Sequence, residues 1–82
     1  MKVTVKLVGR YKDIIGKESL EIDIQKGNTI WDVVDAFAQQ YPEIERDKKF
    51  IMVAKSNRYT TFDEKIEDGD EITISPPVVS GG

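Results

Sequence analysis

Residues 29–42, TIWDVVDAFAQQYP, are the stretch that decides the fold. Apolar residues recur there at spacings i, i+3, i+4, i+7, i+8 and i+11, which predicts a helix of about three turns with one apolar stripe. The stripe consists of Ile30, Val33, Val34, Phe37, Ala38 and Tyr41. Thr29 and Asp32 form a weaker version of the capping box at the start, and Pro42 prevents the helix from continuing. Trp31 lies about 100° off the stripe, so we expect it to be half-buried.

Predicted β-strands flank this helix on both sides in the sequence. Residues 3–7 and 20–24 alternate between apolar and polar before the helix, and residues 71–75 alternate after it. A period of two is typical of a strand with one buried face. The run 50–54 is apolar throughout, which predicts a strand buried on both faces, and residues 59–62 form a further short strand.

Turn-forming and charged residues separate these elements. Residues 11–15 have apolar residues at helical spacing and are followed by Gly16, which predicts a short helical turn closed by glycine. Residues 43–49 are predicted to be a charged loop. Turns are expected at residues 56–57 and, more strongly, at residues 68–70, which read Asp-Gly-Asp.

The order is therefore strand, strand, helix, strand, short strand, strand. One amphipathic helix against one mixed sheet is an α+β two-layer domain. The first two strands can form an antiparallel hairpin, and the last strand can pair with the first. That arrangement is a β-grasp, or ubiquitin-like, fold, and we predict it for residues 1–75, with residues 76–82 as an extended C-terminal tail.

Composition excludes several classes of function. The chain has 82 residues and a net charge of −3, which argues against a nucleic-acid partner. It has no Cys and no His, so thiol catalysis, imidazole catalysis and the metal sites built from these residues are excluded. No apolar run approaches the length of about 18 residues that a membrane span needs, and the N-terminus alternates like a strand. We therefore expect a cytoplasmic protein with no membrane partner.

The C-terminal residues, SPPVVSGG from Ser75 to Gly82, suggest a chemistry. A Gly-Gly end has no Cβ atoms and can enter a channel too narrow for side chains. The group it presents is the α-carboxylate of Gly82, which becomes an acyl donor once ATP converts it to an acyl-adenylate. The tail is then a substrate rather than a catalyst, which suits a chain without His or Cys. The alternative is that the tail is functionally silent, as most chain termini are.

The stretch from Asp68 to Gly82 resembles the C-terminus of the small subunit of molybdopterin synthase, the MoaD-like family. The start is similar as well, with residues 3–7 followed by the residues RY at 10–11 and IIGKE at 14–18. The family has a β-grasp fold. One departure is that the family often has aromatic residues before Pro-Pro, where this chain has Ile74-Ser75, which could alter the choice of partner.

The resemblance implies roles for the residues of the tail. Gly82 is the position that a ubiquitin-activating-type enzyme adenylates with ATP and that a sulfur-donor system then converts to a thiocarboxylate. The large subunit of the synthase, in an expected heterotetramer, carries the catalytic groups and uses this sulfur on cyclic pyranopterin monophosphate. No cofactor is bound by the chain itself. The residues that thread into the large subunit are Pro76, Pro77, Val78, Val79, Ser80 and Gly81.

Further expectations concern partners. An exposed apolar face near Ile74, Pro76 and Val78 would need a partner to cover it, so Ile74 is predicted to be an interface residue. The six acidic residues between Asp63 and Glu71 form either a solvated turn region or a docking surface for a basic partner. Alternative functions are a related carrier for tRNA thiolation, thiamin synthesis or protein conjugation, or a non-catalytic interaction module.

Overall fold

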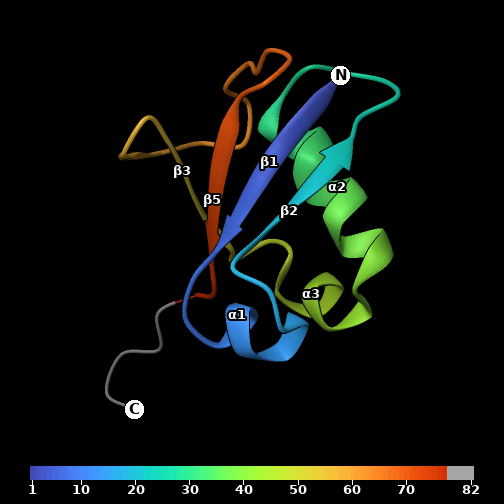
Figure 1. Cartoon of the computed structure of the whole chain (residues 1–82). Helices are drawn as coiled ribbons and strands as arrows, with labels where there is room; N and C mark the ends of the chain where they lie inside the picture. Colours follow the sequence, from blue (N-terminus) through green and yellow to red (C-terminus); the bar gives the residue numbers. More distant parts are fainter. Residues whose placement is uncertain (78–82) are drawn as a thin grey trace.

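The computed structural model describes residues 1–77 (Figure 1). A five-stranded sheet lies against helices, with the elements in the order that the sequence predicts apart from one added helix. The elements are β1 Lys2–Leu7, α1 Arg10–Ile15, β2 Ser19–Asp23, α2 Ile30–Gln40, α3 Pro42–Asp47, β3 Met52–Lys55, β4 Arg58–Thr60 and β5 Glu71–Ser75. Among these residues, none of the helices has the length and apolar character that crossing a membrane requires.

The strand order in the sheet is β2-β1-β5-β3-β4. β1 and β5 are parallel neighbours, with Val5 opposite Ile72 and Leu7 opposite Ile74. β1 pairs with β2 antiparallel, and β3 pairs antiparallel with both β5 and β4. The predicted hairpin, the predicted pairing of the last strand with the first and the β-grasp fold are therefore confirmed.

The core lies between the sheet and α2, which runs along one side of it (Figure 1). The stripe on α2 is buried as predicted, and Phe37 has no exposed surface. Tyr41 ends the helix and is only partly buried, with its ring 5.4 Å from that of Phe37. At the other end, the backbone N–H of Thr29 donates to Asp32 Oδ2 at 2.9 Å, as the capping motif predicts. From the sheet, the core takes Val3, Val5, Leu7, Ile22, Val53, Ile72 and Ile74.

Residues 43–49 were expected to form a charged loop, and that prediction is wrong because Pro42–Asp47 is the helix α3. Proline cannot continue α2, but its fixed φ and missing N–H suit the first position of a new helix. Glu43 and Glu45 lie in its first turn, where their negative charges stabilise the helix by interacting with the positive end of the helix dipole. Ile44 supplies the anchor, since it is fully buried.

The run 50–54 is not a strand buried on both faces. β3 begins only at Met52, and Phe50 before it is 68% exposed. Ile51 and Val53 are buried, whereas Met52 and Ala54, which alternate with them, are only partly covered. β4 ends at Thr60, earlier than expected.

Phe62 lies outside β4 and packs edge-on against Trp31. The two ring centroids are 4.4 Å apart, with an interplanar angle of 85°. Trp31, predicted to be half-buried, is 41% exposed with this ring beside it.

Candidate functional site

The sheet fixes the point from which the C-terminal tail departs. β5 is the central strand, held by β1 on one side and by β3 on the other. Its last pairs join Ile74 to Leu7 and Ser75 to Met52, so the backbone is held on both sides up to Ile74 and on the β3 side at Ser75. A central strand paired on both sides is among the least mobile parts of a small domain. Any chemistry at the end of the chain therefore has a rigid base.

Ile74 does not lie on an exposed face, so its prediction as an interface residue is wrong. Its side chain has no exposed surface and packs in the core. The reason is the period of two in β5, which places Ile74 on the same face as the buried Ile72. Thr73 and Ser75 point to the opposite face of the sheet and are only partly buried.

Pro76 leaves the sheet across Gly9. A Cβ built on Gly9 would lie 3.4 Å from Cγ and 3.5 Å from Cδ of Pro76, so the proline ring lies directly against the glycine. Gly9 has φ 62° and ψ −142°, a backbone conformation that L-residues with a Cβ rarely adopt. The loop between β1 and α1 thus provides a seat without a side chain for the first residue of the tail. We call Gly9 and Pro76 the tail seat.

A hydrogen-bond cluster holds α1, and with it the loop of the tail seat. The hydroxyl of Tyr11 donates to Asp47 Oδ2 at 2.7 Å, and Arg10 donates to the same oxygen at 2.9 Å. Burial, followed by the hydrogen bond to Asp47, raises the pKa of Tyr11 above its ordinary value. The hydrogen bond from Tyr11 lowers the pKa of Asp47. These contacts tie α1 to α3 and have a structural role.

The sheet face opposite α2, which we call the outer face, carries apolar surface close to the tail seat. Val8 is 40% exposed and Tyr59 is 70% exposed, and Ala54 pairs with both Tyr59 and Thr73. A hollow of about 310 Å³ lies here, lined by Val8, Ala54, Asn57, Arg58, Tyr59, Thr73 and Ser75. None of the residues predicted to form an apolar face lines this hollow: Ile74 is buried, Pro76 is not among the lining residues, and Val78 lies outside the described residues. Sequence alternation could have found Tyr59 and Thr73, whereas Val8 follows its strand and gives no periodic signal.

The acidic residues between Asp63 and Glu71 are mostly engaged within the chain. Lys55 Nζ lies 3.2 Å from Asp70 Oδ2 and 3.7 Å from Glu64 Oε2, and it donates to the carbonyl of Lys65 at 2.9 Å. Asp70 also accepts from the backbone N–H of Glu67 at 2.8 Å, and this bond, with Lys55 nearby, lowers its pKa.

Two more of these acids have partners in the described chain. Asp63 accepts from the hydroxyl of Thr61 at 2.6 Å, and this bond lowers the pKa of Asp63. Asp68 accepts from the backbone N–H of Lys2 at 2.7 Å. These bonds favour a turn region that folds onto itself over a docking surface for a basic partner.

The remaining site residues of the sequence analysis lie outside the described residues: Val78, Val79, Ser80, Gly81 and Gly82. Their roles, and the boundary between a domain of residues 1–75 and a tail of residues 76–82, stay predictions. Within residues 1–77, no three acidic side chains lie together as a metal-binding group would.

The fold and the position of the tail define a ubiquitin-like β-grasp protein. The crystal structure of SAMP1 from Haloferax volcanii is similar over the whole length of both chains, with 26% identity and a TM-score of 0.81. In a protein-protein complex of subunits 1 and 2 of molybdopterin-converting factor from Helicobacter pylori, one chain has the same fold, with 24% identity over 99% of this chain and all of that one and a TM-score of 0.64.

Comparison of sequences identifies the family to which the chain belongs. The ThiS family profile matches residues 5–82, and the chain belongs to the ThiS family. A molybdopterin synthase sulfur carrier subunit from Dictyostelium discoideum is 34% identical over 79 residues, which cover 93% of this chain and 91% of the relative. The subunit of the same name from Arabidopsis thaliana is 27% identical over 82 residues, all of this chain and 84% of the relative. The resemblance to MoaD-like sulfur carriers is thus confirmed.

Proposed function

We propose that this chain carries sulfur on its C-terminal glycine for the synthesis of molybdopterin. The observation that carries the proposal is a Gly-Gly tail that departs from the rigid central strand of a β-grasp domain, in a chain whose relatives are molybdopterin synthase sulfur carrier subunits. Partner proteins would bind the folded domain, and the reacting group is the α-carboxylate of Gly82. The proposed setting is the cytoplasm.

The proposed activation uses ATP bound by a ubiquitin-activating-type enzyme, and none bound by this chain. A carboxylate oxygen of Gly82 attacks the α-phosphorus of ATP, pyrophosphate leaves, and an acyl-adenylate forms. A sulfide-level nucleophile from a sulfur-donor system then attacks the carbonyl carbon and AMP leaves, which gives a thiocarboxylate. The role of this chain is to provide a C-terminal end without side chains, since a Cβ at Gly81 or Gly82 would widen the segment that enters the active site.

The proposed acceptor complex is a molybdopterin synthase, with two copies of this chain and two large subunits. The tail from Pro76 to Gly82 enters the large subunit, and the outer face beside it, with Val8, Ala54 and Tyr59, is covered by the same partner. Aromatic and apolar surface of this kind is typical of the centre of an interface. The complex of subunits 1 and 2 from Helicobacter pylori supports a large-subunit partner.

Protein conjugation is a second candidate, favoured by the similarity to SAMP1, a small archaeal modifier protein, over the full length of both chains. The first step is identical. The acyl-adenylate, or a thioester made from it, is then attacked by the Nζ of a lysine, AMP or the thiol leaves, and an amide forms. Transfer of sulfur to tRNA or to the thiazole of thiamin starts from the same thiocarboxylate and differs only in the acceptor.

The experiment that separates these functions starts from a chain that already ends in a thiocarboxylate. This chain is mixed with the candidate large subunit and cyclic pyranopterin monophosphate, and molybdopterin is measured. We expect product from the thiocarboxylate form and none from the carboxylate form. Absence of product, together with adducts on lysines of other proteins in the presence of ATP and the activating enzyme, would instead support conjugation.

A further inference from the structure

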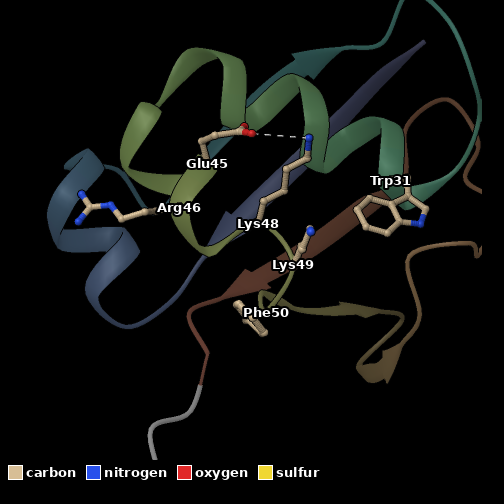
Figure 2. Close-up of a pocket in the computed structure, with 6 residues that line it drawn as sticks. All are labelled: Trp31, Glu45, Arg46, Lys48, Lys49 and Phe50. Carbon is tan, nitrogen blue, oxygen red and sulfur yellow. Dashed lines mark ion pairs between the residues drawn. The ribbon is translucent and has the colours of Figure 1, made fainter.

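A second hollow lies on the helix side of the molecule, away from the outer face. It has a volume of about 300 Å³, and we call it the helix-side hollow. Its lining residues come from the start of α2, from α3 and from the segment before β3: Trp31, Glu45, Arg46, Lys48, Lys49 and Phe50 (Figure 2). Neither the core nor the proposed tail chemistry uses these side chains, so their grouping calls for another explanation.

Two aromatic rings that line this hollow are accessible to solvent. Trp31 is 41% exposed and Phe50 is 68% exposed. They belong to different segments of the chain, and Figure 2 shows them on two sides of the hollow, with Lys49 between. Exposed Trp and Phe side chains are enriched at the centres of protein interfaces, because each buries a large apolar area at a small loss of side-chain freedom.

The charge of the hollow is opposite to that of the whole chain. The chain has a net charge of −3, but the hollow is lined by three cations and one acid. Lys48 is already engaged, since its Nζ lies 2.5 Å from Asp35 and 4.0 Å from Glu45. Within residues 1–77, Lys49 and Arg46 form no ion pair. The hollow thus offers the unpaired ammonium of Lys49 beside two accessible rings, whereas Arg46 lies at its far edge with its side chain directed toward α1 (Figure 2).

The shape of the hollow favours a peptide segment over a small molecule. Its volume is at the low end of the range of about 300–1,000 Å³ for small-ligand pockets. Figure 2 shows its side chains spread around an open depression rather than closing over it, with Arg46 extended toward α1. An extended segment can place one apolar side chain between the two rings and a carboxylate on Lys49.

We propose that the helix-side hollow docks an acidic segment of a partner protein that carries an aromatic or aliphatic anchor. Phe50 lies two residues before Met52, which pairs with Ser75 at the end of β5, so the hollow reaches the end of the sheet from which the tail departs. A partner bound there would hold the domain from the helix side and leave the outer face accessible to a second protein. This inference goes beyond the sulfur-carrier function and does not depend on it.

The test uses the intrinsic fluorescence of Trp31, which is the only tryptophan of the chain. The probe is a synthetic peptide of glutamates around one phenylalanine and one leucine, titrated into the full chain at low salt. We expect saturable binding that weakens with added salt, because exposed charges are screened. The variants K49E and F50A are compared with K17E, a reversal of an exposed lysine in the segment between α1 and β2.

The reversal K49E removes one attraction and adds one repulsion, so we expect it to raise the Kd about five- to tenfold. F50A should also raise the Kd, and K17E should leave it unchanged within about twofold. Circular dichroism establishes that each variant is folded. The proposal is overturned if no saturable binding occurs, if K17E weakens binding as much as K49E, or if ATP or a peptide with lysines in place of the glutamates binds as tightly as the acidic peptide.

Discussion

Replacing Gly9 by alanine tests whether the tail seat has the role that the structure gives it. The φ of 62° and ψ of −142° at Gly9 are strained for any residue with a Cβ, at a cost of about 2–3 kcal/mol in the free energy of unfolding. The added Cβ would also lie 3.4 Å from Pro76 Cγ and press on the first residue of the tail. For a domain of this size, the midpoint of thermal unfolding falls by about 4–8 °C per kcal/mol.

Gly16→Ala is the matched control. Gly16 has φ 80° and ψ 17°, the ordinary left-handed region, and a Cβ there would meet no atom within 4 Å. Its expected cost is about 1 kcal/mol. A second variant of the tail seat, Pro76→Ala, removes the ring without straining Gly9. Thermal unfolding followed by circular dichroism measures all three, and ATP-dependent activation of the tail is then measured at a temperature where each variant is folded.

We expect Gly9→Ala to lower the midpoint more than Gly16→Ala does. We also expect Gly9→Ala and Pro76→Ala to slow activation of the tail, while Gly16→Ala leaves the rate unchanged. Equal losses of stability for the two glycine variants would show that the conformation of Gly9 is not strained as described. Normal activation in both seat variants would refute the role of the seat in directing the tail.

Three further predictions concern stability. Phe37→Ala should cost about 3–5 kcal/mol in urea unfolding, because this side chain is fully buried against the sheet; a loss below about 1 kcal/mol would contradict the packing of α2. The lowered pKa values of Asp47 and Asp70 contribute stability that is present above pH 3.8 and lost as pH falls through their folded-state pKa values. Asp47→Asn should therefore make the free energy of unfolding depend less steeply on pH in this acidic range. Removing Gly81 and Gly82 should leave the unfolding midpoint unchanged, and a large fall would show that the tail packs on the domain.

The repeating patterns of the sequence were enough to predict most of the fold. The stripe on α2 and the alternation of β1, β2 and β5 identify which side of each element faces the core. The same alternation already implies that Ile74 is buried with Ile72, and the prediction of an interface role for Ile74 disregarded it. The helix α3 was missed because Pro42 was treated only as the end of one helix, although proline also favours the start of another.

The parts that sequence could not predict depend on contacts between distant segments. Nothing local indicates that Pro76 lies against Gly9, since the two residues meet only after β1 and β5 pair. The exposure of Phe50 depends on where β3 begins, and a continuous apolar run does not mark that position. The helix-side hollow likewise forms only when Trp31, at the start of α2, and residues 45–50 come to line one depression.

The central claim is that the reacting atom is the carboxyl carbon of Gly82 and that its position at the end of the chain is essential. The direct measurement is intact-mass analysis after incubation with the activating enzyme, ATP and a sulfur donor. The native chain should gain the mass of one oxygen replaced by sulfur, located at its last residue. A chain with one alanine appended after Gly82 should gain nothing while its circular dichroism spectrum is unchanged, because the extra residue displaces the carboxylate by about 3.3–3.6 Å. Equal thiolation of both chains, or no activation of either, would contradict the account.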